Sequence, residues 1–132
     1  MGLSAQNVQA FRALASRLAG FTELLPGWDS YGARSVHPTA IQQTFDILAH
    51  LLESGLLLPS GVVPTSSGGT QLEWSVAGLE LEIEIHGDSH FELLLETLDN
   101  TVERSLVGLP ELLSCISPYL SVSGGIGGES SG

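Results

Sequence analysis

Glutamate recurs at alternate positions in one segment of the chain, residues 70–96 (TQLEWSVAGLELEIEIHGDSHFELLLE). Side chains two residues apart lie on the same face of an extended strand. One predicted face is apolar: Leu72, Trp74, Val76, Leu79, Leu81, Ile83 and Ile85. The opposite face collects six carboxylates: Glu73, Glu80, Glu82, Glu84, Glu92 and Glu96. The segment therefore predicts a sheet with one apolar and one carboxylate-rich face.

Carboxylates gathered in this way can serve catalysis, metal binding or contact with a charged partner. Acid–base catalysis needs burial and mutual repulsion to drive the pKa values of two carboxyl groups apart. An antiparallel sheet commonly leaves one face open to water, where these conditions are not met. The pattern therefore favours a solvated face or an acidic contact surface, and we expect no enzyme and no cofactor.

Two histidines offer a second chemistry at the end of this segment. His86 and His90 flank the turn 87–89 and can meet across it. Imidazole and carboxylate are both ligands of zinc and manganese, so these histidines with Glu84, Glu92 or Asp88 form a candidate site for a divalent cation. The spacing matches no established ligand motif, and polar turn residues are the simpler interpretation.

The loop 27–33, GWDSYGA, places two large aromatic residues and one acid between two glycines. In a structural interpretation, Trp28 and Tyr31 cover the core between two helices while Asp29 accepts hydrogen bonds from loop N–H groups. In a functional interpretation, the same three residues contact a partner or ligand, because Trp and Tyr are concentrated in binding hot spots. The sequence favours structure and leaves both readings open.

Charge narrows the class of partner. Fifteen acidic residues oppose four arginines, lysine is absent, and the net charge is −11. Such a chain lacks the cationic face that binds phosphates, so we expect no direct contact with nucleic acid. An acidic surface instead suits a basic protein, although solubility alone also explains the composition.

Two further features bear on location. Cys115 is the single cysteine, so no disulfide within the chain is possible and a reducing cytoplasm is expected. No run of about 18 apolar residues is present, so no membrane span is expected.

Segments with helical spacing precede and follow the predicted sheet in the sequence. Apolar residues at three- and four-residue steps predict a first helix over 5–24, capped by Ser4, and a second over 39–54, introduced by Pro38. A short helix is predicted over 109–120. The residues expected in the core are Phe11, Leu18, Phe45, Leu48, Trp74, Leu81, Ile83, Phe91 and Leu93.

The strands are predicted from the period-two pattern. Strands over 70–76 and 79–85 joined by a two-residue turn pair Val76 with Leu79 and place Glu73 opposite Glu82. Further strands are expected over 62–63, 91–97 and 102–107. The predicted fold is α+β, with two N-terminal helices and a short C-terminal helix on one face of an antiparallel sheet of three to five strands. Residues 1–120 form this domain, and 121–132 are a Gly/Ser tail expected to be disordered.

Two motifs together carry a resemblance. GWDSYGA (27–33) and VVPTSSGGTQLEW (62–74) resemble a group of small bacterial and phage-associated proteins of uncharacterised function, over roughly 25–85. The resemblance implies a bacterial or phage origin in the cytoplasm and brings no catalytic residue with it.

The functional hypothesis is a non-enzymatic, inhibitor- or antitoxin-like interaction protein. It presents the carboxylate-rich face to a basic protein such as a nuclease or toxin. The alternative is a small ligand- or metal-binding module that uses the GWDSYGA loop or His86 and His90.

Overall fold

A computed structural model describes residues 4–121 of the 132-residue chain. The order of elements is α1 (Ala5–Gly20), η1 (Phe21–Glu23), α2 (Pro38–Glu53), β1 (Gly61–Pro64), β2 (Thr70–Val76), β3 (Leu79–Ile85), β4 (His90–Thr97), β5 (Thr101–Val107), α3 (Leu109–Ile116) and η2 (Ser117–Tyr119). The predicted α+β class is confirmed, with three α-helices and an antiparallel sheet of five strands. The tail was predicted over 121–132, and from residue 122 onward it lies outside the described residues.

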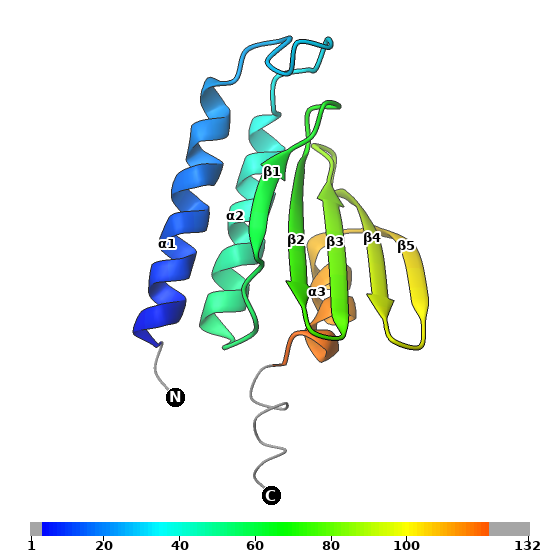
Figure 1. Ribbon diagram of the computed structural model, residues 1–132. Helices are drawn as coiled ribbons and strands as arrows, with labels where there is room; N and C mark the ends of the chain where they lie inside the picture. Colours follow the sequence, from blue (N-terminus) through cyan, green and yellow to red (C-terminus); the bar gives the residue numbers. More distant parts are fainter. Residues whose placement is uncertain (1–3, 122–132) are drawn as a thin grey trace, which may run out of the picture.

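The strands form a meander in the order β1-β2-β3-β4-β5, in which each strand pairs with the next along the chain. Helix α2 contacts β2 and β3, α3 contacts β5, and α1 contacts α2 and the edge strand β1. In Figure 1, α2 and α3 cross behind the sheet while its other face carries no helix. The sheet therefore has one covered face and one open face within the described residues.

Local signals set the helix ends. The Ser4 hydroxyl accepts a hydrogen bond from the Asn7 N–H at 3.0 Å, as expected for an N-cap. Helix α1 ends at Gly20, and a 3₁₀ turn replaces the last residues of the predicted helix. Pro38 is the first residue of α2, and Gly55 follows this helix with a φ of +70°. The third helix also ends early, at Ile116, and continues as a 3₁₀ turn.

The predicted register is confirmed. Val76 pairs with Leu79, Trp74 with Leu81, and Leu72 with Ile83. A two-residue turn fixes this alignment, and any one-residue slip would turn the apolar side chains to water. His86 and His90 continue the pairing of β3 with β4, which leaves the three-residue turn 87–89. This odd number keeps the parity, so the apolar side chains of β4 face the same way.

The core lies between the sheet and the helices. Trp74 is fully buried, and its indole N–H donates to the Leu57 carbonyl at 2.9 Å. The predicted core is confirmed except on one flank. Phe45 is 40% exposed, because it lies at the side of α2 with its ring in edge contact with the half-buried Phe11.

The glycine pair of the second motif has a structural role. A Cβ on Gly69 would overlap the Ile85 carbonyl oxygen, and one on Gly68 would lie 3.0 Å from the His37 ring. Gly68 also has a φ of +98°, which side chains disfavour. The Thr65 hydroxyl accepts from the Gly69 N–H at 3.0 Å. These contacts explain SSGG as the tight connection that brings β1 beside β2.

Across residues 4–121, no helix combines the length and apolar character needed to cross a membrane.

Candidate interaction surface on the open sheet face

Seven glutamates occupy the open face of the sheet, which we call the acidic face: Glu73, Glu80, Glu82, Glu84, Glu92, Glu96 and Glu103. Five are exposed, and Glu73 and Glu84 are half-buried. The structure thus brings together all six glutamates predicted for this face. Sequence reasoning missed Glu103, which lies in the strand predicted over 102–107. Glu103 is on the same face as Ser105, which pairs with Glu92.

Three pairs of glutamates on the acidic face are directly opposed: Glu73 with Glu82, Glu84 with Glu92, and Glu80 with Glu96. Like charges opposed across antiparallel strands destabilise a sheet by roughly 0.2–1 kcal/mol per pair. The neighbours of these pairs are few: the Gln71 amide donates to Glu73, the Ser75 hydroxyl donates to Glu80, and the His86 ring lies 3.6 Å from Glu92. Folding alone does not require this concentration of charge.

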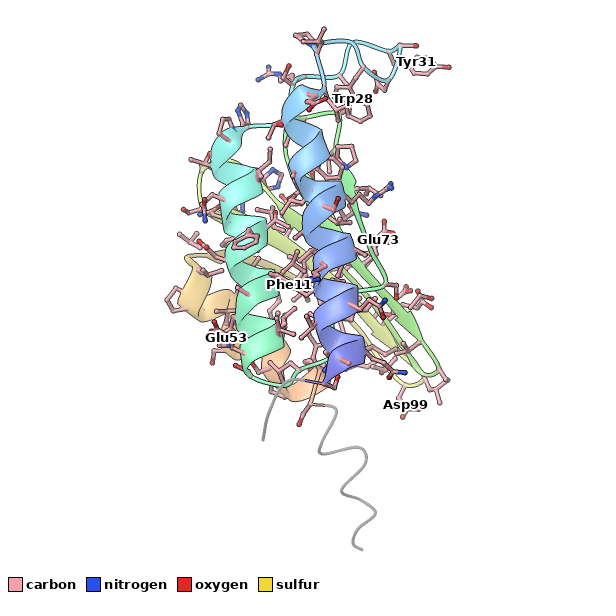
Figure 2. All side chains as sticks on the ribbon, turned by 90° about the vertical axis from the view of Figure 1, so that its left-hand side faces the viewer. Phe11, Trp28, Tyr31, Glu53, Glu73 and Asp99 are labelled. Atoms are coloured by element: carbon pink, nitrogen blue, oxygen red, sulfur yellow. The ribbon has the colours of Figure 1, made fainter. Side chains whose placement is uncertain are left out.

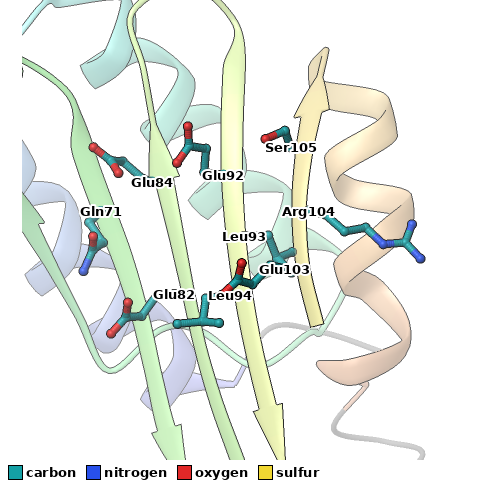
Figure 3. A pocket seen from close by; sticks show the side chains of 9 residues that line it. All are labelled: Gln71, Glu82, Glu84, Glu92, Leu93, Leu94, Glu103, Arg104 and Ser105. Carbon is teal, nitrogen blue, oxygen red and sulfur yellow. The ribbon is translucent and has the colours of Figure 1, made fainter. Parts of the chain in front are cut away.

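No arginine compensates the acidic face in the described part of the chain. Arg104 borders the hollow on this face, but it pairs in register with the covered Leu93 and its side chain points away from the glutamates (Figure 3). Arg17 lies on α1, and its Nε–H donates to the Val62 carbonyl at the edge of β1 at 2.7 Å. The one ion pair between side chains of residues 4–121 joins His86, and not an arginine, to Glu92. The acidic face is therefore electrostatically unbalanced.

A shallow hollow of about 480 Å³ lies on this face between β3 and β5. Figure 3 shows Glu84 and Glu92 side by side at one end and Leu94 at the other. Leu94 is half-buried and is the one large apolar side chain among the glutamates of β4. Carboxylates around an aliphatic floor suit the side chain of Lys or Arg, which has an apolar stem and a charged end.

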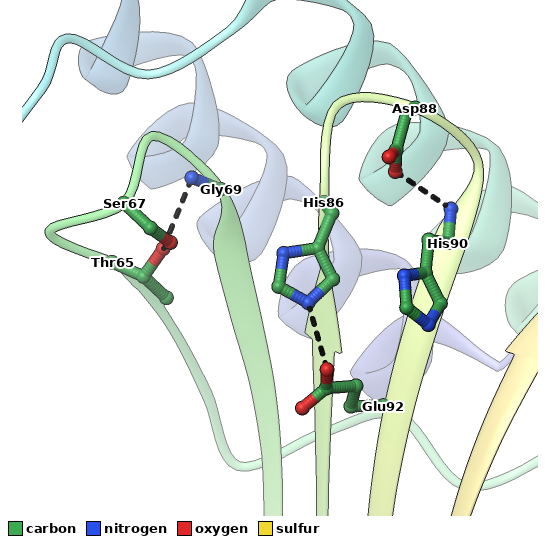
Figure 4. Close-up of polar contacts among 7 residues, drawn as sticks. All are labelled: Thr65, Ser67, Gly69, His86, Asp88, His90 and Glu92. Atoms are coloured by element: carbon green, nitrogen blue, oxygen red, sulfur yellow. Dashed lines mark hydrogen bonds and ion pairs between the residues drawn. The ribbon is translucent and has the colours of Figure 1, made fainter.

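The two histidines meet beside the acidic face, as predicted. Their ring centroids are 5.3 Å apart, and the His86 N–H donates to the His90 carbonyl at 3.0 Å. His86 Nε2 lies 3.6 Å from a carboxylate oxygen of Glu92 (Figure 4). Asp88 turns away from this pair and accepts from the His90 N–H at 3.2 Å.

The GWDSYGA loop divides into structural and exposed residues. Asp29 accepts from the N–H groups of Tyr31 at 2.8 Å and Ala33 at 3.1 Å, which confirms the predicted role in satisfying the loop backbone. Trp28 is half-buried, and its indole N–H donates to the Arg34 carbonyl at 2.8 Å. The expectation that Tyr31 covers the core is wrong, because its side chain is 91% exposed and points away from the loop (Figure 2). Ser30, with a φ of +68°, turns the chain outward at this point.

The predicted site residues therefore form two separate groups. The glutamates lie on the sheet, whereas Trp28, Asp29 and Tyr31 lie at the loop beyond the ends of α1 and α2 (Figure 2). Neither aromatic residue lines the pocket beside His86, which includes His37 and Gly87. Leu98 lies in the turn after β4 and is 90% exposed.

Comparison of the chain with protein-family models, curated protein sequences and solved structures gives no match.

Proposed function

We propose that this protein is a non-enzymatic interaction protein that binds a basic protein partner through its acidic face. The observation that carries the proposal is the arrangement of seven glutamates on the open face of the sheet, with no arginine among them. Natural sequences usually alternate the signs of surface charge, since opposed like charges cost stability. Because repulsion between the opposed glutamates destabilises the sheet, their presence favours a function for this negative charge.

The geometry supports a defined contact surface. Neighbouring strands lie about 4.8 Å apart and alternate residues about 6.8 Å apart, so the carboxylates form a regular array on a rigid support. Such an array presents spaced negative charge to a cationic surface, as nucleic acid does. A basic nuclease or toxin is therefore the partner class we propose, with the chain acting as an inhibitor or antitoxin in the cytoplasm.

The proposal is tested by comparing two variants of equal net charge. The sheet variant carries E80Q, E82Q, E96Q and E103Q, all exposed positions on the acidic face. The control variant carries E23Q, D46N, E53Q and E111Q, all exposed positions outside the sheet. Each is immobilised beside the wild type and exposed to cytoplasmic extract of the source organism at low and high salt. Bound proteins are then identified by mass spectrometry.

We expect the wild type and the control variant to retain the same basic protein, with release at high salt, and the sheet variant to lose it. A partner retained equally by both variants would place the contact elsewhere. Loss from both variants alike would show that net charge, and not the acidic face, drives the association. Circular dichroism confirms that each variant is folded.

A further inference from the structure

One of the three opposed glutamate pairs differs from the other two because an imidazole stands beside it. Ligand atoms of Glu84, His86 and Glu92 lie within 4.8 Å of one another. Among the described residues, neither the Glu73–Glu82 pair nor the Glu80–Glu96 pair belongs to such a group of three. These two pairs therefore serve as controls for the effect of the histidine on an opposed pair of glutamates.

One nitrogen of the His86 ring makes no hydrogen bond. Its Nε2 atom is shielded from water and makes no hydrogen bond, although the side chain as a whole is 27% exposed. A buried polar atom left unpaired costs free energy, so such atoms mark places where a further partner fits. The atom faces the Glu92 carboxylate at 3.6 Å, too far for a hydrogen bond.

This separation fits a bridging metal ion. Zinc binds imidazole nitrogen and carboxylate oxygen at about 2.0–2.2 Å, so two such atoms on one tetrahedral ion lie about 3.3–3.6 Å apart. The 3.6 Å between His86 Nε2 and Glu92 lies within this range. Glu84 has a ligand atom no more than 4.8 Å from those of His86 and Glu92, and it reaches the same ion with a side-chain movement of up to about 1.5 Å.

The backbone that carries these ligands is held in place. Glu84 and Glu92 are paired residues of adjacent strands, and His86 continues the pairing through its hydrogen bond to His90. The turn is fastened to α2, where the Thr39 hydroxyl donates to the Gly87 carbonyl at 2.7 Å and the Gln43 amide to the Ser89 hydroxyl at 2.6 Å. Because the backbone of the site is already ordered, little conformational entropy is lost when a ligand binds.

We propose that Glu84, His86 and Glu92 bind one divalent transition-metal ion, with zinc as the best match to an imidazole and two carboxylates. Three protein ligands with the remaining position open to water is a common zinc arrangement. The ion satisfies the unpaired nitrogen and neutralises the opposed carboxylates. Glu84 and Glu92 belong to the acidic face, but the partner-binding test leaves both unchanged, so the metal site and the proposed function can fail independently.

The test is a calorimetric titration of the full chain, purified without a histidine tag and freed of metal by a chelator. Zinc chloride is added in a weakly coordinating buffer, and magnesium chloride serves as the comparison. We expect one zinc ion per chain and magnesium affinity at least about tenfold lower, because magnesium prefers oxygen ligands and keeps its waters. A stoichiometry well away from one, or equal affinity for magnesium, would overturn the proposal.

Variants then locate the ion. His86→Ala and the double variant E84Q/E92Q are expected to weaken zinc binding at least about tenfold, since each removes direct ligands. The matched control E80Q/E96Q removes the same charge from an opposed pair without a histidine and is expected to change affinity by less than about threefold. An equal loss in the control would mean that zinc is held by general surface charge.

A measurement on the wild type does not depend on how the variants fold. Nuclear magnetic resonance of the imidazole nitrogens follows each of the four histidines during the zinc titration. We expect the His86 ring signal to respond first and to saturate at one equivalent. Zinc binding that leaves this signal unchanged would contradict the assigned site.

Discussion

The two faces of the same strands differ in almost every respect. On the covered face, Leu72, Trp74, Leu81, Ile83 and Leu93 pack against the helices in the core. On the open face, the residues between them are mostly glutamates in contact with water. Burial of the covered face supplies the free energy that folds the sheet. The open face is therefore free to carry charge that folding does not need, and it is the place to look for function.

The largest effect that sharpens this comparison comes from two leucines that are neighbours in β4. Leu93 is 5% exposed on the covered face, whereas Leu94 is half-buried on the acidic face. We expect Leu93→Ala to lower the free energy of unfolding by about 2–5 kcal/mol, because it opens a cavity. Leu94→Ala should cost about 1 kcal/mol or less. Urea denaturation measures both, and equal losses would mean that the open face is packed against something.

The GWDSYGA loop provides a contrast of intermediate size. Asp29→Ala removes the acceptor of two backbone N–H groups and is expected to destabilise the protein by about 1–2 kcal/mol. Tyr31→Ala should change stability by less than about 0.5 kcal/mol, because the side chain is exposed. Thermal denaturation tests both changes. An equal loss of stability for Tyr31→Ala and Asp29→Ala would contradict the exposed position of the Tyr31 side chain.

The smallest effect has the opposite sign. Glu82→Gln relieves the repulsion with the opposed Glu73, so we expect the free energy of unfolding to rise by a few tenths to about 1 kcal/mol. Glu103→Gln is the matched control, because Glu103 faces Leu94 and has no opposed carboxylate. The gain should shrink when salt is added, since salt screens exposed charges. Destabilisation by Glu82→Gln would show that this carboxylate is used within the fold.

Sequence patterns predicted the sheet better than the surface elements. The pairing of Trp74 with Leu81 follows from a two-residue turn and a strict alternation, and both are visible in the sequence. The wide apolar arc of its helix predicts that Phe45 lies in the core, but its position on the flank depends on where α1 lies. The composition of the loop gives no sign of the turn that Asp29 and Ser30 make, so it does not predict the exposure of Tyr31.

The candidate site shows the same division. Six of the glutamates of the acidic face follow from parity along continuous strands. Glu103 was missed because its strand is mostly exposed and so has a weak apolar pattern. The distance between His86 and Glu92 depends on side-chain positions across a turn, which residue order does not specify.

If the acidic face steers a basic partner to the protein, the association rate depends on these glutamates and on salt. For the partner recovered with the wild type, the association rate is measured by stopped flow at ionic strengths from about 0.02 to 0.5 M. We expect the sheet variant (E80Q, E82Q, E96Q and E103Q) to associate about tenfold more slowly at low salt and to depend less on salt, whereas the helix-side control of equal charge behaves like the wild type. Identical rates and salt dependence for the two variants would mean that the acidic face does not steer the partner.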